Sequence, residues 1–185
     1  HKNDIDVFNI NIIDELTDSK YINDISKTDI AEVIVGTNVT SIGNNAFEFA
    51  TDLTSITIPN SVTEIGENAF WGAENLTTVN ISQTDSTLNN LGNYAFFKAA
   101  SLISITIPDS VTEIGENAFK QASNLTTVII SQTDSSLNNI GGYAFYQALS
   151  LTSITIPNSV TEIGPHAFQY TTSLRTIRIH KNVTL

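Results

Sequence analysis

The sequence predicts a mainly β repeat solenoid. It would be a right-handed coil with a parallel sheet of about seven short strands on one side and loops or short helical turns on the other. The first observation is a hexapeptide, (Ile/Leu)-Gly-x-x-Ala-Phe, that occurs six times. The second is its spacing of alternately 23 and 26 residues, a period typical of repeat architectures. The third is an apolar pair with period two, such as Ile56/Ile58, ahead of each hexapeptide, which indicates a short strand with one buried face.

Each part of the unit has a physical role. The strands are expected near 33–35, 55–58, 78–81, 104–107, 127–130, 153–156 and 176–179. Pro59 and its equivalents follow a strand, where no ladder hydrogen bond is needed. The glycine of Ile65-Gly66 provides either a positive φ or a close backbone approach at a corner. The Ala-Phe pair that follows places one small and one large side chain in the core, from a short helical turn or a loop. One unit cannot bury its own apolar edge, so the units must stack.

The chain divides into an N-terminal segment, 1–30, and the repeats, 31–185. Residues 1–30 lack the repeat signature and are acidic, so we expect them to cap the first turn. The long units contain three extra residues, at Ser82–Ser86 and Ser131–Ser135. The last repeat is incomplete, which predicts that the chain is part of a longer array or that a downstream cap has been removed.

The composition excludes several functions. The chain of 185 residues is 41% hydrophobic and 15% charged, with a net charge of −11, so it can build a core but is a poor binder of nucleic acid. Cys and Met are absent, which rules out disulfides and thiolate chemistry. No apolar run approaches the roughly 18 residues that cross a bilayer. We therefore expect no membrane insertion by this segment and a monomeric state.

The repeat unit resembles the BspA-like (Treponema pallidum-type) leucine-rich repeat. The segment from Ile56 to Phe70, ITIPNSVTEIGENAF, is similar to that family's consensus, and the match covers about 30–185. The sequence departs from the family in one column, where Ala50, Ala73 and their equivalents replace a frequent Cys. The resemblance implies a secreted or cell-surface protein, commonly an adhesin or interaction module that binds host matrix proteins.

No residue pattern predicts catalysis, a cofactor or a firm metal site. The histidines, His1, His166 and His180, are far apart in the repeat register, so a hydrolytic triad is not expected. Glu64, Glu113 and Glu162 recur in one column, which is better explained as a solvated face than as a glycosidase pair. The inserts contain one carboxylate each, Asp85 and Asp134, too few oxygen ligands to predict Ca²⁺ binding, although the possibility stays open.

The outward residues of the strands form the candidate partner-binding face, which we expect to be concave. These residues are Ser55, Thr57, Thr78, Asn80, Ser104, Thr106, Thr127, Ile129, Ser153, Thr155, Thr176 and Arg178. One interpretation is a hydroxyl-rich surface that binds a protein or glycan. The alternative is that Ser and Thr are simply good strand residues whose hydroxyls pair between strands. An ice-binding threonine array is disfavoured, because the alternating unit length breaks its regularity.

Two further patterns leave function open. An aromatic column contains Trp71, Phe97 and Tyr146, which would either anchor a partner or pack between turns. Segments 53–101 and 102–150 are identical at 37 of 49 positions, and the differences are almost all at exposed or edge positions. The leading hypothesis is a non-catalytic adhesion or protein-interaction module, extracellular or on the cell surface. The alternatives are a structural spacer that presents other domains and, less favoured, a glycan-binding module.

Overall fold

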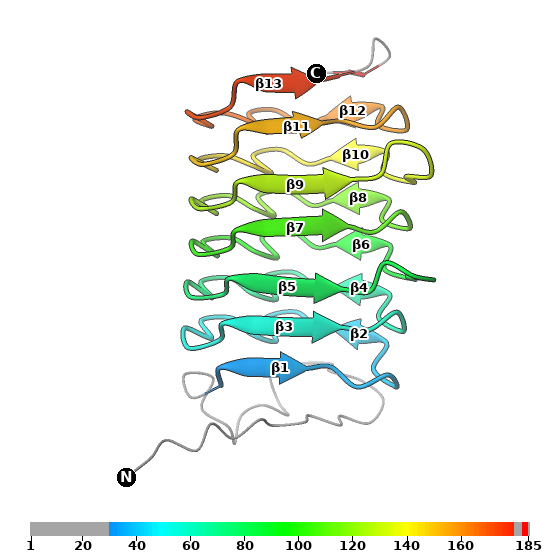
Figure 1. Cartoon of the computed structure of the whole chain (residues 1–185), viewed down its shortest axis with the longest axis vertical. Helices are drawn as coiled ribbons and strands as arrows, with labels where there is room; N and C mark the ends of the chain where they lie inside the picture. Colours follow the sequence, from blue (N-terminus) through cyan, green and yellow to red (C-terminus); the bar gives the residue numbers. More distant parts are fainter. Residues whose placement is uncertain (1–29, 180–182, 185) are drawn as a thin grey trace.

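The computed structural model describes residues 30–179 and 183–184, which form a right-handed coil of stacked turns (Figure 1). Residues 1–29, and with them almost all of the predicted cap, lie outside the described residues. The described chain contains thirteen strands in two parallel sheets. The seven-stranded sheet consists of β1 (Glu32–Ile34), β3 (Ser55–Ile58), β5 (Thr78–Ile81), β7 (Ser104–Ile107), β9 (Thr127–Ile130), β11 (Ser153–Thr155) and β13 (Thr176–Arg178). The six-stranded sheet consists of β2 (Ser41–Ile42), β4 (Glu64–Ile65), β6 (Asn90–Leu91), β8 (Glu113–Ile114), β10 (Asn139–Ile140) and β12 (Glu162–Ile163).

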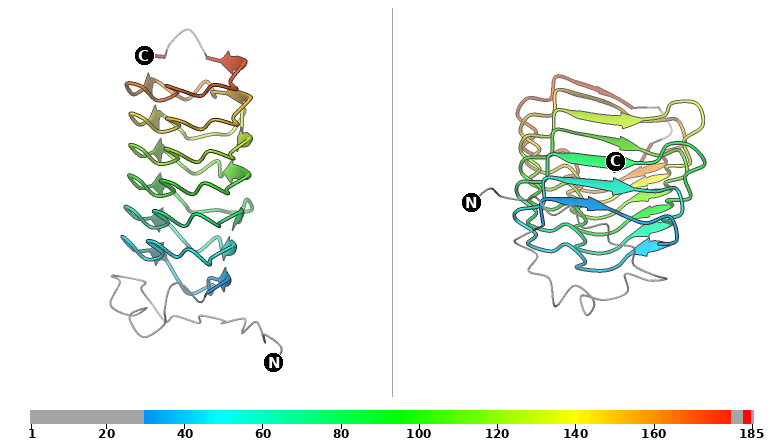
Figure 2. Two further views of the ribbon diagram at one scale, coloured as in Figure 1. Left: turned by 90° about the vertical axis from the view of Figure 1, so that its left-hand side faces the viewer. Right: turned by 60° about the horizontal axis from the view of Figure 1, so that its bottom comes forward.

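The seven-stranded sheet confirms the predicted strands within a residue at each end. Strands β1 to β11 of this sheet alternate buried and solvent-facing residues, as in β5, where Val79 and Ile81 are buried and Thr78 and Asn80 are exposed. All three residues of the terminal strand β13 are exposed. Each strand pairs with the next one in register, so that equivalent residues of successive turns lie side by side. The turns stack in a nearly straight column, so the face of this sheet is close to flat along its length, with little of the expected concavity (Figure 2).

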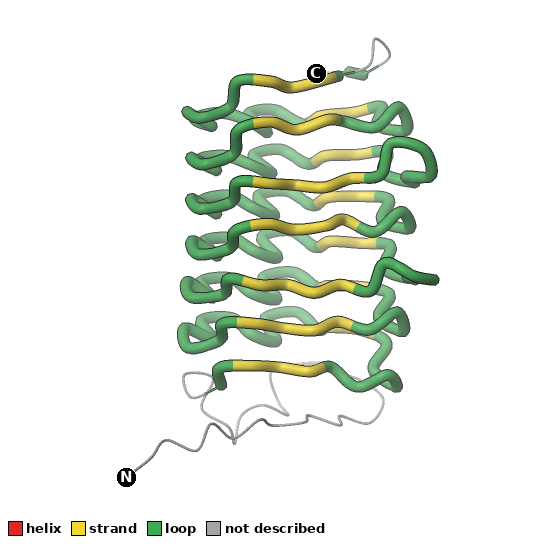
Figure 3. Tube along the Cα trace, viewed as in Figure 1, coloured by secondary structure: helices red, strands yellow, loops and turns green. Residues whose placement is uncertain are grey.

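The opposite side differs from the prediction of loops and short helical turns. The described residues contain no helix, and a second parallel sheet runs along this side, joined to the first by loops and turns (Figure 3). Its strands are dipeptides such as Glu64–Ile65, in which the carboxylate faces solvent and the isoleucine is buried. A two-residue strand is too short to show a period of two, so the sequence pattern could not distinguish it from a loop.

The core between the two sheets is a ladder of phenylalanine rings. Phe47, Phe70, Phe96, Phe119, Phe145 and Phe168 stack in sequence, with neighbouring ring centroids 5.0–5.3 Å apart and planes within 2–7° of parallel. The first five rings are at most 1% exposed, and the alanines before and after them in the repeat are equally buried. Each ring therefore fills one turn and contacts the equivalent ring of the neighbouring turns, which explains why the Ala-Phe pair is the same in all six hexapeptides.

The repeated glycine at the corner is explained by close approach, the second of the two predicted roles. A Cβ added to Gly92 would lie 2.6 Å from the carbonyl carbon of Gly66, and one added to Gly115 would lie 2.6 Å from that of Gly92. Neither glycine has a positive φ. The backbones of neighbouring turns touch at this corner, so any larger residue would force the turns apart.

Positive φ instead occurs at two other columns of each turn. One column follows the corner glycine by two residues and contains Asn45, Asn68, Tyr94, Asn117, Tyr143 and His166, with φ between 55° and 60°. The other contains Phe49, Gly72, Lys98, Gln121, Gln147 and Tyr170, with φ between 56° and 70°. Asn tolerates the left-handed region well, whereas lysine, glutamine and aromatic residues rarely adopt it. The turn is thus held by its neighbours, through bonds such as Phe49 N to the Trp71 carbonyl at 2.7 Å.

Candidate functional site

The candidate face predicted from the sequence exists as one continuous surface on the seven-stranded sheet. The register aligns Ser55, Thr78, Ser104, Thr127, Ser153 and Thr176 in one column. In the second column Thr57 pairs with Asn80, Thr106 with Ile129, and Thr155 with Arg178. In β3 to β13, Arg178 is the one charged side chain of these two columns, in a protein whose net charge is −11.

The hydroxyls of this face do not hold the sheet together. Within the described part of the chain, those of Ser55, Ser104, Ser153, Thr57, Thr106, Thr155 and Thr176 make no hydrogen bond. A different threonine column does bridge the turns: Thr77 Oγ1 donates to the Thr54 carbonyl at 3.0 Å, and Thr126 Oγ1 donates to the Ile103 carbonyl at 3.0 Å. The predicted alternative, in which face hydroxyls pair between strands, is therefore wrong for these residues.

A shallow groove interrupts this face between β9 and β11. The two strands pair only at Thr127 and Ser153, and a groove of about 280 Å³ opens beyond that pair. Gln132, from the second insert, donates its side-chain amide to the Ile130 carbonyl at 2.7 Å and to the Thr155 carbonyl at 3.3 Å. Ile129 stands at the edge of the groove and is 53% exposed. Gln132 of the insert thus links the two strands across the groove, and Ile129 of β9 adds an apolar contact point to a polar face.

The six-stranded sheet has an acidic outer face. Asn90 is paired in register between Glu64 and Glu113, and together with Glu67 these residues line a polar hollow of about 350 Å³. Asn139 Nδ2 donates to Glu113 Oε1 at 3.0 Å. Among the described residues, no group of three or more His, Cys, Asp or Glu side chains is placed to hold a metal ion. The carboxylate column is thus interleaved with amides.

The aromatic column seen in the sequence belongs to a larger strip of touching rings. We define the aromatic strip as Phe49, Trp71, Tyr94, Phe97, Tyr143, Tyr146 and Tyr170. Trp71 contacts Phe49, Tyr94 and Phe97, with centroid distances of 5.8, 6.2 and 5.4 Å. Tyr146 contacts Tyr143 at 5.6 Å and Tyr170 at 5.2 Å. Phe49 and Tyr170, at the two ends, are 55% and 56% exposed.

One lysine joins the two halves of the strip, and a second lies on its first half. Lys120 Nζ lies 5.8 Å from the Phe97 ring centroid, 5.2 Å from that of Tyr143 and 5.1 Å from that of Tyr146. Lys98 Nζ lies 5.6 Å from the Phe97 centroid. Neither ammonium forms an ion pair with any described carboxylate. His166, which the sequence predicted to be a surface substitution, is exposed and packs on Tyr143 at 4.9 Å.

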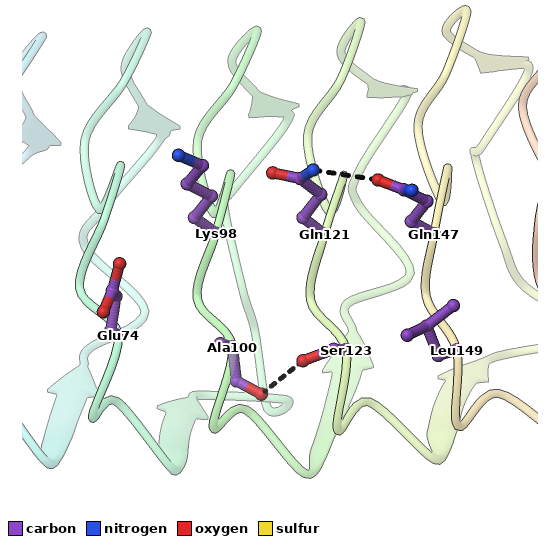
Figure 4. A pocket seen from close by; sticks show the side chains of 7 residues that line it. All are labelled: Glu74, Lys98, Ala100, Gln121, Ser123, Gln147 and Leu149. Atoms are coloured by element: carbon purple, nitrogen blue, oxygen red, sulfur yellow. Dashed lines mark hydrogen bonds between the residues drawn. The ribbon is translucent and has the colours of Figure 1, made fainter.

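A groove of about 340 Å³ runs beside the strip, along the stacking axis (Figure 4). We call it the turn-side groove. One wall is formed by the second of the two positive-φ columns, with Lys98, Gln121 and Gln147. The other wall consists of Glu74, Ala100, Ser123 and Leu149, two residues further along each turn. Gln121 Nε2 donates to Gln147 Oε1 at 2.8 Å, so the amides of neighbouring turns are linked (Figure 4).

The sequence pattern did not reveal the turn-side groove, although it contained a signal. The columns of Trp71, Gly72 and Glu74 occupy six positions in segment 53–101, and all six differ in segment 102–150. The pairs are Trp71/Lys120, Gly72/Gln121, Glu74/Ser123, Phe97/Tyr146, Lys98/Gln147 and Ala100/Leu149. Only six of the other 43 positions differ. The divergence of the duplicated segments is thus concentrated on the strip and groove.

A family model for the BspA-type leucine-rich-repeat region matches the chain in six copies, over residues 20–139 and 89–185. The chain belongs to this family. BspA-type leucine-rich repeats form protein-interaction modules and are generally non-catalytic, in line with the interaction role predicted from the sequence. No match was found among curated proteins.

Solved structures of similar proteins share the fold of this chain. A Treponema pallidum leucine-rich-repeat protein is 25% identical, with a TM-score of 0.74 over 80% of this chain and 69% of that one. The pneumococcal vaccine antigen PcpA is 25% identical, with a TM-score of 0.74 over 92% of this chain and 44% of that one. A leucine-rich cell-surface protein of Faecalibacterium prausnitzii is 29% identical, with a TM-score of 0.57 over 80% and 47%. The chain spans less than half of the last two proteins.

The remaining predicted residues have simple surroundings. Asp134 Oδ2 accepts a hydrogen bond from its neighbour Thr133 at 2.9 Å, and Asp85 is exposed with a φ of 51°. His1 and His180 lie outside the described residues. In the part of the chain that the structure describes, no helix is long and apolar enough to span a bilayer.

Proposed function

We propose that this BspA-type module is a non-catalytic adhesion module, secreted or displayed at a cell surface, that binds a host or extracellular-matrix protein through the face of the seven-stranded sheet. The observation that carries the proposal is the set of outward hydroxyls on β3, β7, β11 and β13 that make no hydrogen bond within the described chain. Their donors and acceptors are free for a partner, whereas the threonines that hold the turns together occupy another column.

The chemistry of the face suits a protein partner. Seven strands about 4.8 Å apart give a surface of roughly 29 Å along the stack, so a protein partner can contact several strands at once. The face is uncharged from β3 to β11, so a partner of either charge can approach without desolvating an ion. Ile129, beside the groove between β9 and β11, provides an apolar anchor near the centre of the C-terminal half.

The surface location is supported by what the similar proteins are described to be. One is a cell-surface protein and another is a vaccine antigen. A spacer that only presents other domains is the alternative, and it would need no free hydroxyl face.

The test is binding of the folded chain to immobilised fibronectin, laminin and collagen at physiological salt. The variant Thr106→Glu/Thr155→Glu places two carboxylates on the face, and we expect it to bind at least about tenfold more weakly because a buried unpaired charge costs several kcal/mol. Asn89→Glu/Asn138→Glu is the matched control. It adds the same charge at exposed positions beside the six-stranded sheet and should bind normally. Equal binding by the two variants would contradict the proposal, as would no binding by the unmodified chain.

A further inference from the structure

We propose that the aromatic strip and the turn-side groove together bind an acidic glycan chain, with Lys98 and Lys120 as the groups that receive its carboxylates or sulfates. This site is separate from the strand face and does not rest on the function proposed for that face. Its residues lie on the turns that precede the strands of the seven-stranded sheet, and the groove follows the stacking axis (Figure 4).

The two lysines are the first observation. Residues 30–179 contain four basic side chains, Lys98, Lys120, Arg175 and Arg178, and twelve acidic ones. Half of these scarce cations lie on rings of the strip. Lys98 and Lys120 contact ring faces and no described carboxylate, so their charges are not neutralised within the described chain. An ammonium that is held on aromatic rings and lacks an acidic partner is suited to bind an anionic group of a ligand.

The shape of the site is the second observation. The rings from Phe49 to Tyr170 follow five steps between turns, or about 24 Å, since neighbouring turns lie about 4.8 Å apart. The strip is only one or two side chains wide. Its area is on the order of 300 Å², well below the roughly 800 Å² per partner of a stable protein interface. A long, narrow surface of this kind fits a thin linear polymer better than a globular protein.

The backbone of the turns distinguishes a glycan from an extended peptide. A peptide that binds in extended form usually adds a strand and uses main-chain hydrogen bonds. On the groove wall formed by Lys98, Gln121 and Gln147, the backbone N–H groups already donate hydrogen bonds to carbonyls of the neighbouring turn. Lys98 N donates to the Lys120 carbonyl at 2.9 Å, and Gln121 N donates to the Tyr146 carbonyl at 2.8 Å. Recognition must therefore use side chains.

Those side chains match the chemistry of an acidic sugar. Aromatic faces pack against the C–H groups of a sugar ring, and the amides of Gln121 and Gln147 and the hydroxyl of Ser123 can exchange hydrogen bonds with its hydroxyls. Lys98, on the groove wall, can pair with its acidic group. Glu74 is the one carboxylate of the groove and opposes an anion at one end.

The duplicated segments are the third observation. All six positions in the columns of Trp71, Gly72 and Glu74 differ between 53–101 and 102–150, although Tyr94 and Tyr143 of the strip are identical. Only one of the four outward strand positions, Asn80/Ile129, differs. A region that only separates other domains would change at all exposed positions alike. The concentration of changes on the strip and groove indicates that successive turns present different contacts to different parts of one ligand.

The test uses Trp71, which lies in the strip and is the single tryptophan of the chain. The folded chain is titrated with hyaluronan and heparin oligosaccharides, to separate carboxylate from sulfate recognition, and with neutral dextran and poly-glutamate. Binding is followed by Trp71 fluorescence and calorimetry. We expect saturable binding of at least one acidic glycan, a change in Trp71 emission, and no comparable binding of dextran or poly-glutamate.

The variants locate the site. Lys98→Gln/Lys120→Gln should weaken glycan binding by about tenfold or more, because two charge-assisted contacts are lost. Arg175→Gln/Arg178→Gln removes the same charge from the last turn and should change binding less than about twofold. Thr106→Glu/Thr155→Glu should also retain glycan binding, which separates this site from the strand face. Three results would overturn the proposal: neither acidic glycan binds, dextran or poly-glutamate binds as tightly, or the arginine variant loses as much affinity as the lysine variant.

Discussion

The strand face and the turn side, which consists of the aromatic strip and the turn-side groove, belong to the same coil. They differ in how closely their residues are repeated from one duplicated segment to the next. Three of the four outward strand positions in segment 53–101 are identical in segment 102–150, whereas none of the six turn-side positions in the columns of Trp71, Gly72 and Glu74 is. The turn-side positions are mostly half-buried and the outward strand positions are mostly exposed, so greater exposure does not explain why the turn-side positions differ more. The comparison teaches that a solenoid can keep one face uniform, for a partner that is met in the same way at each turn, while another face varies.

The largest effect is expected from the core that supports both surfaces. Phe96 is fully buried and stacks between Phe70 at 5.0 Å and Phe119 at 5.2 Å. Phe96→Ala should lower the free energy of unfolding by about 3–5 kcal/mol, because it removes a large side chain and leaves a cavity in the ring ladder. Chemical denaturation measures the loss. Phe168→Ala, at the less buried end of the ladder, is the matched control and should cost clearly less. Equal losses would show that the ladder is not a continuous core.

A smaller effect on stability is expected at the corner of the fifth turn, where two adjacent glycines, Gly141 and Gly142, should respond differently to substitution by alanine. A Cβ on Gly141 would lie 2.6 Å from the Glu116 backbone nitrogen, whereas one on Gly142 would lie 3.4 Å from its nearest neighbour, the Pro165 carbonyl oxygen. Gly141→Ala should therefore destabilise the protein by about 1–3 kcal/mol through overpacking. Gly142→Ala should be neutral or stabilise by up to about 1 kcal/mol, since its φ is not in the left-handed region. Thermal unfolding measures the stability of the two variants. A less stable Gly142→Ala than Gly141→Ala would refute the close-approach explanation.

The smallest effect is expected on ligand affinity, from a substitution that changes the turn-side groove alone. Glu74→Gln removes the carboxylate of the turn-side groove, and the acidic glycan should then bind roughly two- to fivefold more tightly, as expected for one exposed like-charge contact. Matrix-protein binding should not change. Glu162→Gln, on the six-stranded sheet, removes the same charge away from the groove and serves as control. A gain that is equal in both variants would indicate a general effect of net charge.

The sequence predicted the parts of the fold that repeat with a recognisable period. The alternation in residues such as Ile56 and Ile58 predicted the seven-stranded sheet, and the invariant Phe column predicted the core. The six-stranded sheet was missed because Glu64–Ile65 and its equivalents are only two residues long. The left-handed turns were missed because Tyr94, Lys98 and Gln121 are residues that favour other conformations and are held there by bonds to the next turn.

Of the two candidate sites, one could be predicted from the sequence and the other could not. The columns of the strand face could be assigned from the repeat register alone, since side chains alternate strictly along a strand. The turn-side groove depends on two columns of side chains from several turns, and on the path of loops without a regular period. The environment of Lys120, which touches rings of three different residues, could not be derived from spacing. The divergent positions of the duplicated segments were visible in the sequence, but their shared location was not.

The central claim is that the strand face and the turn side are two independent binding surfaces. The most direct measurement is to titrate both Thr106→Glu/Thr155→Glu and Lys98→Gln/Lys120→Gln with the matrix protein and with the acidic glycan that the unmodified chain binds. The account predicts that the threonine variant loses only the protein and that the lysine variant loses only the glycan. Loss of both ligands by either variant, with the fold and thermal midpoint retained, would contradict it and indicate a single shared surface.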